Sequence, residues 1–114
     1  MDSAGNLQIA DVMMAKRRIQ DYARVTPLIR AEGLEKLFGG AEVWLKLENL
    51  QHTGSFKVRG VANKMLSMTE DERKRGVTAA SSGNHAQAVS YMARMLGTKA
   101  VIVMPENAPR TKVA

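Results

Sequence analysis

Apolar residues recur along the chain with two different periods, which predict helices and strands. A spacing of three and four residues predicts the main helices, at 7–23, 56–66 and 84–96. Alternating or continuous apolar runs predict the strands, at 43–47, 77–80 and 100–104. Shorter elements are expected between them: an extended segment at 28–30, a helix at 32–38, and a helix that Thr69 and Glu72 cap and Gly76 ends. Helices thus separate the three longer strands.

The order of these elements indicates the fold class. A strand, a helical crossover and a second strand form a parallel unit, so the sequence predicts an α/β fold of parallel-sheet β-α-β units. Residues 100–104 are apolar throughout, which is typical of a strand buried on both faces. Residues 108–114 begin a further helix, with Pro109 in its first turn. Because so few strands cannot complete such a sheet, the chain is expected to be the incomplete N-terminal part of a larger fold.

The composition narrows the class of protein. Hydrophobic residues make up 45% of the 114 residues and charged residues 25%, as in globular proteins. No apolar run reaches the roughly 18 residues that span a membrane, and the lack of cysteine excludes disulfides and fits a cytoplasmic protein. The net charge of +6 raises the question of nucleic acid, but acidic residues lie near the basic runs: Asp11 and Asp21 flank the run at 16–18, and three acidic residues at 70–72 precede the run at 73–75. No nucleic-acid partner is therefore expected. His52 and His85 have no metal-ligand spacing, and His52 is expected to be exposed.

A lysine stands where a loop gives way to the second main helix. In the preceding loop, Gly54 permits an unusual backbone angle and the close approach of a ligand. Lys57 falls in the first helical turn, where the partial positive charge of the helix N-terminus favours the neutral amine that Schiff-base chemistry requires. Arg59 and Lys64, on the same helix, are expected to be protonated and to point outward. The spacing alone favours a solvated surface lysine.

A second loop joins the strand at 77–80 to the helix at 84–96. Its residues are Ser81, Ser82, Gly83, Asn84 and His85. Their hydroxyl, amide and backbone donors at a helix start can bind a carboxylate. Serine and asparagine are also favoured helix caps, so the same residues fit a purely structural cap. Both loops lie where a strand is followed by a helix, the edge at which open parallel sheets bind ligands.

The two loops, taken in this order, resemble a known family. The run LKLENLQHTGSFKVRG at 45–60 is similar to the lysine segment of the serine/threonine dehydratase (threonine ammonia-lyase) family of pyridoxal-phosphate enzymes. The run ASSGNHAQ at 80–87 resembles the asparagine loop of that family. Thr-Pro-Leu at 26–28 and the segment 103–109 match as well. The resemblance covers nearly the whole chain, from about Ile9 onward.

The resemblance implies a set of site residues. Lys57 would hold pyridoxal 5'-phosphate as a Schiff base, and Phe56 would pack against the cofactor ring. Asn84 would donate a hydrogen bond to the ring hydroxyl, and residues 81–85 would bind the substrate carboxylate. In the racemases of the family, the serine equivalent to Ser82 moves a proton on the ring face opposite the lysine. The catalytic residues implied are therefore Lys57 and Ser82.

The resemblance also implies a fold, a reaction and partners. The fold would be the N-terminal part of the tryptophan-synthase-β-like pyridoxal-phosphate fold, with a first helix and strands in 1–52, and the lysine helix and the start of a smaller domain in 53–114. The reaction would convert L-threonine or L-serine to a 2-keto acid and ammonia. The partners would be a small amino acid, the C-terminal part of the same enzyme and further copies in a homo-oligomer.

Part of the family pattern is not matched in these residues. The glycine-rich phosphate loop and the residue that faces the pyridine nitrogen belong to the C-terminal part. The chain by itself is therefore expected to bind the cofactor weakly and to be inactive. An amino-acid racemase or a hydroxyaspartate dehydratase of the same family, and a non-catalytic α/β module, remain open alternatives.

Overall fold

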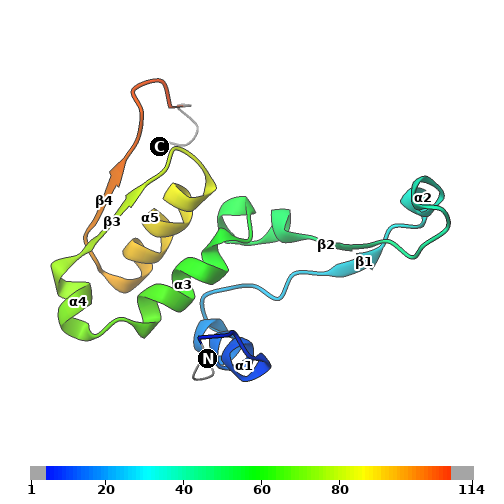
Figure 1. Ribbon diagram of the computed structural model, residues 1–114. Helices are drawn as coiled ribbons and strands as arrows, with labels where there is room; N and C mark the ends of the chain where they lie inside the picture. Colours follow the sequence, from blue (N-terminus) through cyan, green and yellow to red (C-terminus); the bar gives the residue numbers. More distant parts are fainter. Residues whose placement is uncertain (1–4, 109–114) are drawn as a thin grey trace.

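The computed structural model describes residues 5–108 as a small parallel sheet, a helix packed on it and a second helix packed on the first, with an extended arm on one side (Figure 1). The N-terminal elements are α1 (Ile9–Ile19), β1 (Leu28–Arg30), α2 (Glu32–Glu35), η1 (Lys36–Phe38) and β2 (Trp44–Lys46). The following elements are η2 (Glu48–Leu50), η3 (His52–Gly54), α3 (Lys57–Ser67), α4 (Glu70–Arg75), β3 (Val77–Ala80), α5 (Asn84–Leu96) and β4 (Ala100–Val103). The elements predicted from the sequence in this range all form. Those at 28–30, 77–80 and 84–96, and the helix between Thr69 and Gly76, have the predicted ends. The helix predicted at 32–38 is divided into α2 and η1, and the others have shifted ends. The helix predicted at 108–114 lies outside the described residues.

The second predicted β-α-β unit is confirmed. Strands β3 and β4 are parallel, in a register that pairs Val77 with Ala100 and Ala80 with Val103, and α5 connects them. Helix α3 lies beside α5 (Figure 1), and the apolar faces of the two helices form most of the core. Val58 and Met92 are fully buried at this contact. Burial of these side chains stabilises the unit because apolar surface leaves water.

The first predicted β-α-β unit, made of β2, α3 and β3, does not form, so this prediction is wrong. Strand β2 pairs with β1, not with β3, and the pairing is antiparallel, with Leu28 opposite Lys46 and Arg30 opposite Trp44. The chain turns back through α2 and η1 between these strands, and it needs no helical crossover to do so. The described residues therefore form two separate two-stranded sheets.

The predicted burial of the last strand on both faces is also wrong for the described structure. Burial alternates along β4, and Val101 and Val103 are 47% and 61% exposed. The reason is that α5 packs against β3 and β4 from one side, and within residues 5–108 no second layer covers the other. In the same way, the stripe of Ile9, Val12 and Met13 on α1 is exposed, and Ile19 alone of the predicted stripe is buried.

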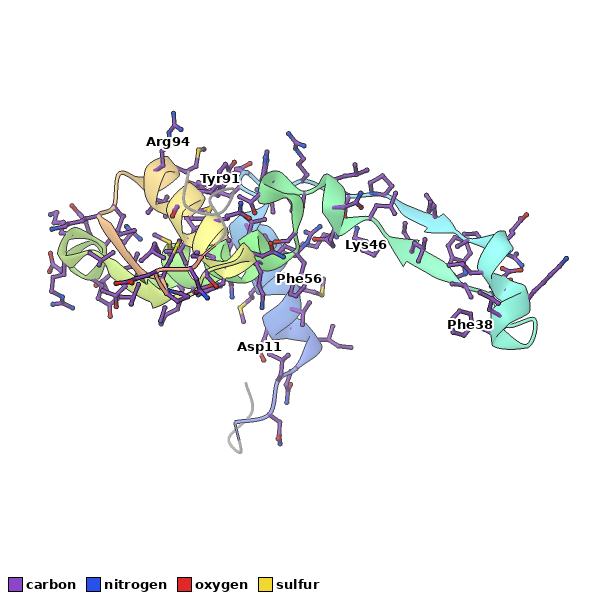
Figure 2. All side chains as sticks on the ribbon, turned by 90° about the horizontal axis from the view of Figure 1, so that it is seen from above. Asp11, Phe38, Lys46, Phe56, Tyr91 and Arg94 are labelled. Carbon is purple, nitrogen blue, oxygen red and sulfur yellow. The ribbon has the colours of Figure 1, made fainter. Side chains whose placement is uncertain are left out.

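An arm made of β1, α2, η1 and β2 extends away from the core (Figures 1 and 2). Phe38 lies at its far end, and Leu37, Phe38 and Trp44 are all more than half exposed. The radius of gyration is 17.1 Å, whereas a compact domain of this length has one of about 13 Å. The arm thus presents apolar surface that the described core does not cover.

The helical spacing of apolar residues predicts Met65, Met68, Met92 and Met95 as core-filling side chains, and Met68 is partly buried in the structure. Met65 and Met92 are buried in the α3–α5 contact, as expected. Met95 is 53% exposed, so its prediction as a core residue is wrong.

Candidate active site

The loop before α3 turns sharply to bring Lys57 to the first position of the helix. Gly54 has a φ of +68°, as its place in the sequence suggested, and Thr53 has a φ of +63°, which is uncommon for a residue with a side chain. The hydroxyl oxygens of Thr53 and Ser55 are buried and have no hydrogen-bond partner. Such local strain and unmet hydrogen bonding are concentrated at functional sites in proteins.

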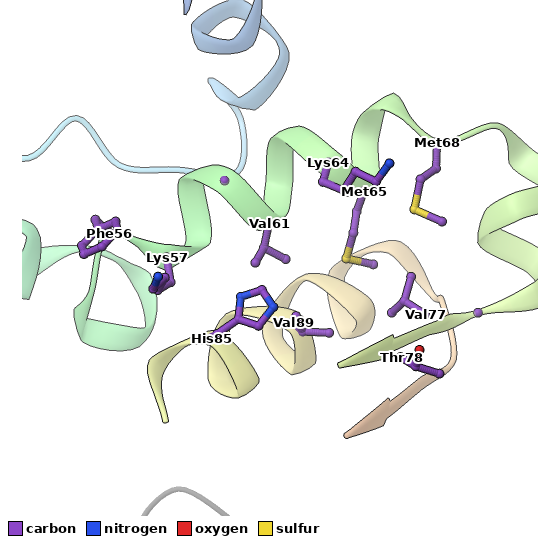
Figure 3. Close-up of a pocket in the computed structure, with 12 residues that line it drawn as sticks. Phe56, Lys57, Val61, Lys64, Met65, Met68, Val77, Thr78, His85 and Val89 are labelled. Carbon is purple, nitrogen blue, oxygen red and sulfur yellow. The ribbon is translucent and has the colours of Figure 1, made fainter. Parts of the chain in front are cut away.

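Lys57 is exposed and lies at the edge of a cavity of about 540 Å³ between α3, α5 and β3 (Figure 3). Its Nζ atom lies 5.0 Å from the centroid of the Phe56 ring, within the range of a cation–π contact. Phe56 itself is 59% exposed. The floor of the cavity is apolar, with Val61, Met65 and Val89 among its lining residues. A flat aromatic group could therefore lie beside a reactive amine here.

The second predicted loop reaches the same region from β3. The backbone N–H of Ser81 donates to the carbonyl of Val103 at 3.0 Å, which extends the sheet by one residue. The Oγ atom of Ser81 accepts a hydrogen bond from the backbone N–H of Gly83 at 3.2 Å, so this hydroxyl holds the turn. Helix α5 then begins at Asn84, with Gly83 as its N-cap.

The structure brings three of the predicted site residues to one cavity. Phe56 and Lys57 line it from α3 and its N-terminal end, and His85 lines it from the first turn of α5 (Figure 3). Four other predicted residues are not among its lining residues, and they form the loop and helix start beside His85: Ser81, Ser82, Gly83 and Asn84. Their proposed contacts with substrate and cofactor stay predictions.

His52 is not the exposed loop residue that the sequence suggested. Its ring is partly buried and stacks on Tyr91 of α5, with 5.2 Å between the centroids and 19° between the planes. Burial and then the charge of Arg24 lower the pKa of His52.

Of the two cations expected to point outward, Lys64 is exposed as expected, whereas Arg59 is only partly exposed. Lys64 lines the cavity from α3. Arg59 forms an ion pair with Glu48, 2.7 Å from Nη2 to Oε1, and its side chain is 32% exposed. The sequence analysis missed this pair because its partners are eleven positions apart, on either side of an irregular loop.

The Arg59–Glu48 pair makes the stability of the fold dependent on pH. The hydrogen bond from Arg59, together with that from Thr26, lowers the pKa of Glu48 from 4.5 to about 2. The pKa of Glu48 is lower in the folded state than in the unfolded state. The ionised carboxylate therefore stabilises the fold fully at a pH above the unfolded-state pKa, and this stabilisation is lost as the pH falls through the folded-state pKa. We expect the free energy of unfolding to drop by about 2–3 kcal/mol between pH 5 and pH 2 through this group.

Urea titrations at a series of pH values measure this effect. Glu48→Gln removes the titrating group, so its unfolding free energy should vary less over the same pH interval. Glu70→Gln, in an exposed pair with Lys74, is the matched control and should keep the wild-type pH dependence. Equal pH dependence in wild type and Glu48→Gln would contradict the assignment.

Two further properties concern the described part of the chain. Between residues 5 and 108, no group of three or more histidine, aspartate or glutamate side chains could hold a metal ion. No helix among these residues is long and apolar enough to cross a membrane.

In this α/β unit, Lys57 at one helix start and His85 at a second helix start line the same cavity, an arrangement in which an amine could bind an aldehyde cofactor. The family model described as "Pyridoxal-phosphate dependent enzyme" matches residues 19–114. The chain belongs to this family, which confirms the expected cofactor class and fold class.

Individual relatives agree with this assignment. A catabolic L-threonine dehydratase from Staphylococcus aureus (strain USA300) is 45% identical over 112 residues, which are 98% of this chain and 32% of the relative. The crystal structure of serine racemase from Dictyostelium discoideum has a TM-score of 0.87 and 41% identity, over 94% of this chain and 35% of the other. The crystal structure of a threonine deaminase from T.th. has a TM-score of 0.81 and 45% identity, over 94% and 33%.

The chain spans about a third of the length of the curated relatives that it matches. The matched third contains the helix with Lys57 and the loop at 81–85. The similarity extends to dehydratases and racemases alike, so it establishes the family and leaves the reaction open.

Proposed function

We propose that this chain supplies the lysine segment and the asparagine loop of a pyridoxal-phosphate enzyme that deaminates L-threonine or L-serine to a 2-keto acid. The observation that carries the proposal is the position of Lys57, exposed at the first residue of α3, beside Phe56 and on the same cavity as His85. The 45% identity to an L-threonine dehydratase over nearly the whole chain supports this reaction.

The residues present fit part of the cofactor. The amine of Lys57 suits the cofactor aldehyde, and the exposed ring of Phe56 offers a surface for an aromatic ring. The buried hydroxyls of Thr53 and Ser55, which have no partner, lie in the loop that leads to Lys57 and could accept or donate further hydrogen bonds. Bound in this site, the cofactor would withdraw electrons from the α-carbon of the amino acid.

The side chains of this chain would divide the remaining work. Lys57 would hold the cofactor and, once released, its amine would take the α-proton. The loop at 81–85 would orient the substrate carboxylate through the N–H groups at the start of α5. His85, on the cavity wall, would lie near that carboxylate. The apolar floor of the cavity would exclude water from the reacting atoms.

A racemase is the second candidate, and one observation favours it. The serine racemase structure matches this chain with a TM-score of 0.87, as good a match as that of the threonine deaminase. In that reaction, Ser82 would move a proton on the side of the α-carbon opposite Lys57. A hydroxyaspartate dehydratase and a non-catalytic module are further alternatives that no observation favours. The cytoplasmic location and the homo-oligomer stay predictions.

A chimeric enzyme separates these candidates. Residues 1–114 would replace the matched third of the Staphylococcus aureus L-threonine dehydratase, and products from L-threonine and L-serine would be measured. We expect 2-keto acid and ammonia in equal amounts, with no D-amino acid. Formation of D-serine as the main product would favour the racemase.

The control for this measurement is the same chimera with Lys57→Ala, which should form neither product. A chimera that folds and binds the cofactor yet forms no product from either amino acid would contradict the proposed reaction. The unaltered Staphylococcus aureus enzyme, assayed in parallel, provides the reference rate.

A further inference from the structure

Arg59 makes contacts that no other residue of α3 makes. Its Nε and Nη2 atoms donate to the two carboxylate oxygens of Glu48, at 2.8 and 2.7 Å. Its Nη2 atom also donates to the carbonyl of Arg24 at 3.1 Å and to the hydroxyl of Thr26 at 3.3 Å. One guanidinium thus joins α3 to two other segments of the chain, and two-pronged binding of a carboxylate fixes its orientation.

The partners of Arg59 are held to one another as well. The hydroxyl of Thr26, a residue only 4% exposed, donates to Glu48, and the Nζ atom of Lys46 donates to the Thr26 carbonyl at 2.6 Å. The buried side chain of Gln51 binds the backbone N–H and carbonyl of Arg24, each at 2.9 Å. We call the group of Arg59, Glu48 and Thr26 the arginine clamp.

The direction of the clamp relative to Lys57 follows from helix geometry. Each residue of an α-helix advances by about 100°, so side chains two positions apart point in nearly opposite directions. Lys57 lines the cavity, and Arg59 is not among the residues that do so. The clamp therefore holds the first turn of α3 from the side opposite the cavity.

We propose that the arginine clamp is a positioning device that sets the rotation of the first turn of α3 and so directs the amine of Lys57 over Phe56 into the cavity. The contacts above show the arginine clamp itself, and its role in positioning Lys57 for a cofactor rests on the proposed function. Arg59 is a positioning residue here, because it reaches Lys57 only through the helix backbone. A purely structural ion pair would stabilise the fold without changing the direction of Lys57.

The Arg30–Glu35 pair provides a matched control. Its Nε and Nη2 atoms also bind both carboxylate oxygens, at 2.7 and 3.3 Å, but it lies in the arm. Arg59→Lys and Arg30→Lys each keep the charge and lose the two-pronged geometry. Glu48→Gln is a milder variant that keeps the shape of the acceptor, and it serves if Arg59→Lys does not fold.

The first measurement needs no cofactor. Lysines are dimethylated with ¹³C-formaldehyde, and the Lys57 methyl signal is identified by its absence in Lys57→Arg. In wild type this signal should be displaced by the Phe56 ring, and Phe56→Leu should remove the displacement. We expect Arg59→Lys to shift it toward the value of the exposed Lys36 and Lys99, and Arg30→Lys to leave it unchanged. An unchanged signal in a folded Arg59→Lys would overturn the inference.

The second measurement uses pyridoxal phosphate itself. Borohydride trapping and peptide mapping give the attachment to Lys57 relative to Lys36 and Lys99. We expect Arg59→Lys to lower this ratio about tenfold or more, because small misplacements of a reacting group cost that much, and Arg30→Lys to keep it. If the wild-type protein showed no selective attachment to Lys57, the proposed function would be contradicted but the clamp inference would not. The methyl signal of Lys57 would still test the clamp inference.

Discussion

Lys57→Arg is expected to abolish the selective covalent attachment of pyridoxal phosphate to this chain when the C-terminal part of the enzyme completes the site, as in the chimera. The guanidinium keeps the positive charge and most of the length of the side chain, but it cannot form the bond to the cofactor aldehyde. Attachment at position 57 should fall to zero, and total labelling should fall to the level of exposed lysines such as Lys36 and Lys99. Borohydride reduction followed by peptide mapping measures both quantities.

The controls for this experiment come from the same chain. Lys64→Arg changes the other lysine that lines the cavity and should leave the labelling of Lys57 intact. Lys57→Ala should show the same loss as Lys57→Arg, without the retained charge. Labelling spread evenly over Lys46, Lys57 and Lys64 in the wild-type chain would mean surface reaction only, and the proposed function would lose its central residue.

Gly76→Ala is expected to destabilise the β3-α5-β4 unit by about 2–4 kcal/mol. Gly76 has a φ of +91°, where an L side chain is strained, and a Cβ atom there would lie 2.8 Å from the carbonyl oxygen of Lys99. That oxygen accepts the hydrogen bond from the N–H of Val77 that opens the β3–β4 ladder, so neither side can move freely. Denaturant unfolding monitored by circular dichroism measures the loss.

Substitutions at two other glycines distinguish the cost of backbone strain from the cost of steric crowding. Gly97 has a φ of +62°, but a Cβ atom added there would meet open space, so Gly97→Ala should cost about 1–2 kcal/mol from backbone strain alone. Gly33 lies in α2 with a negative φ and open space, and Gly33→Ala should be neutral or slightly stabilising. If Gly76→Ala were as stable as Gly97→Ala, the carbonyl group of Lys99 would move away from the added Cβ atom at little cost in free energy, and the prediction would be wrong.

The pattern of apolar and polar residues determined the local structure of this chain. The helical stripe that includes Val58, Val61 and Met65 is buried where the spacing predicted, since a helix with one apolar face has one favourable way to pack. The start of α3 after Gly54 followed from the same kind of local signal. These signals depend on neighbours within a few positions, which is why the sequence alone was sufficient.

The tertiary structure decided which segments meet. The antiparallel pairing of β2 with β1 and the exposure of one face of β4 depend on where distant backbone groups lie. The residues of one strand do not specify which other strand pairs with it or what covers its faces. The site shows the same division. The sequence singled out Lys57 and His85, but only the fold placed both on one cavity. The contact of Arg59 with Glu48 and Thr26 joins three segments, so it exists only once hydrophobic packing has brought α3 and the N-terminal segment together.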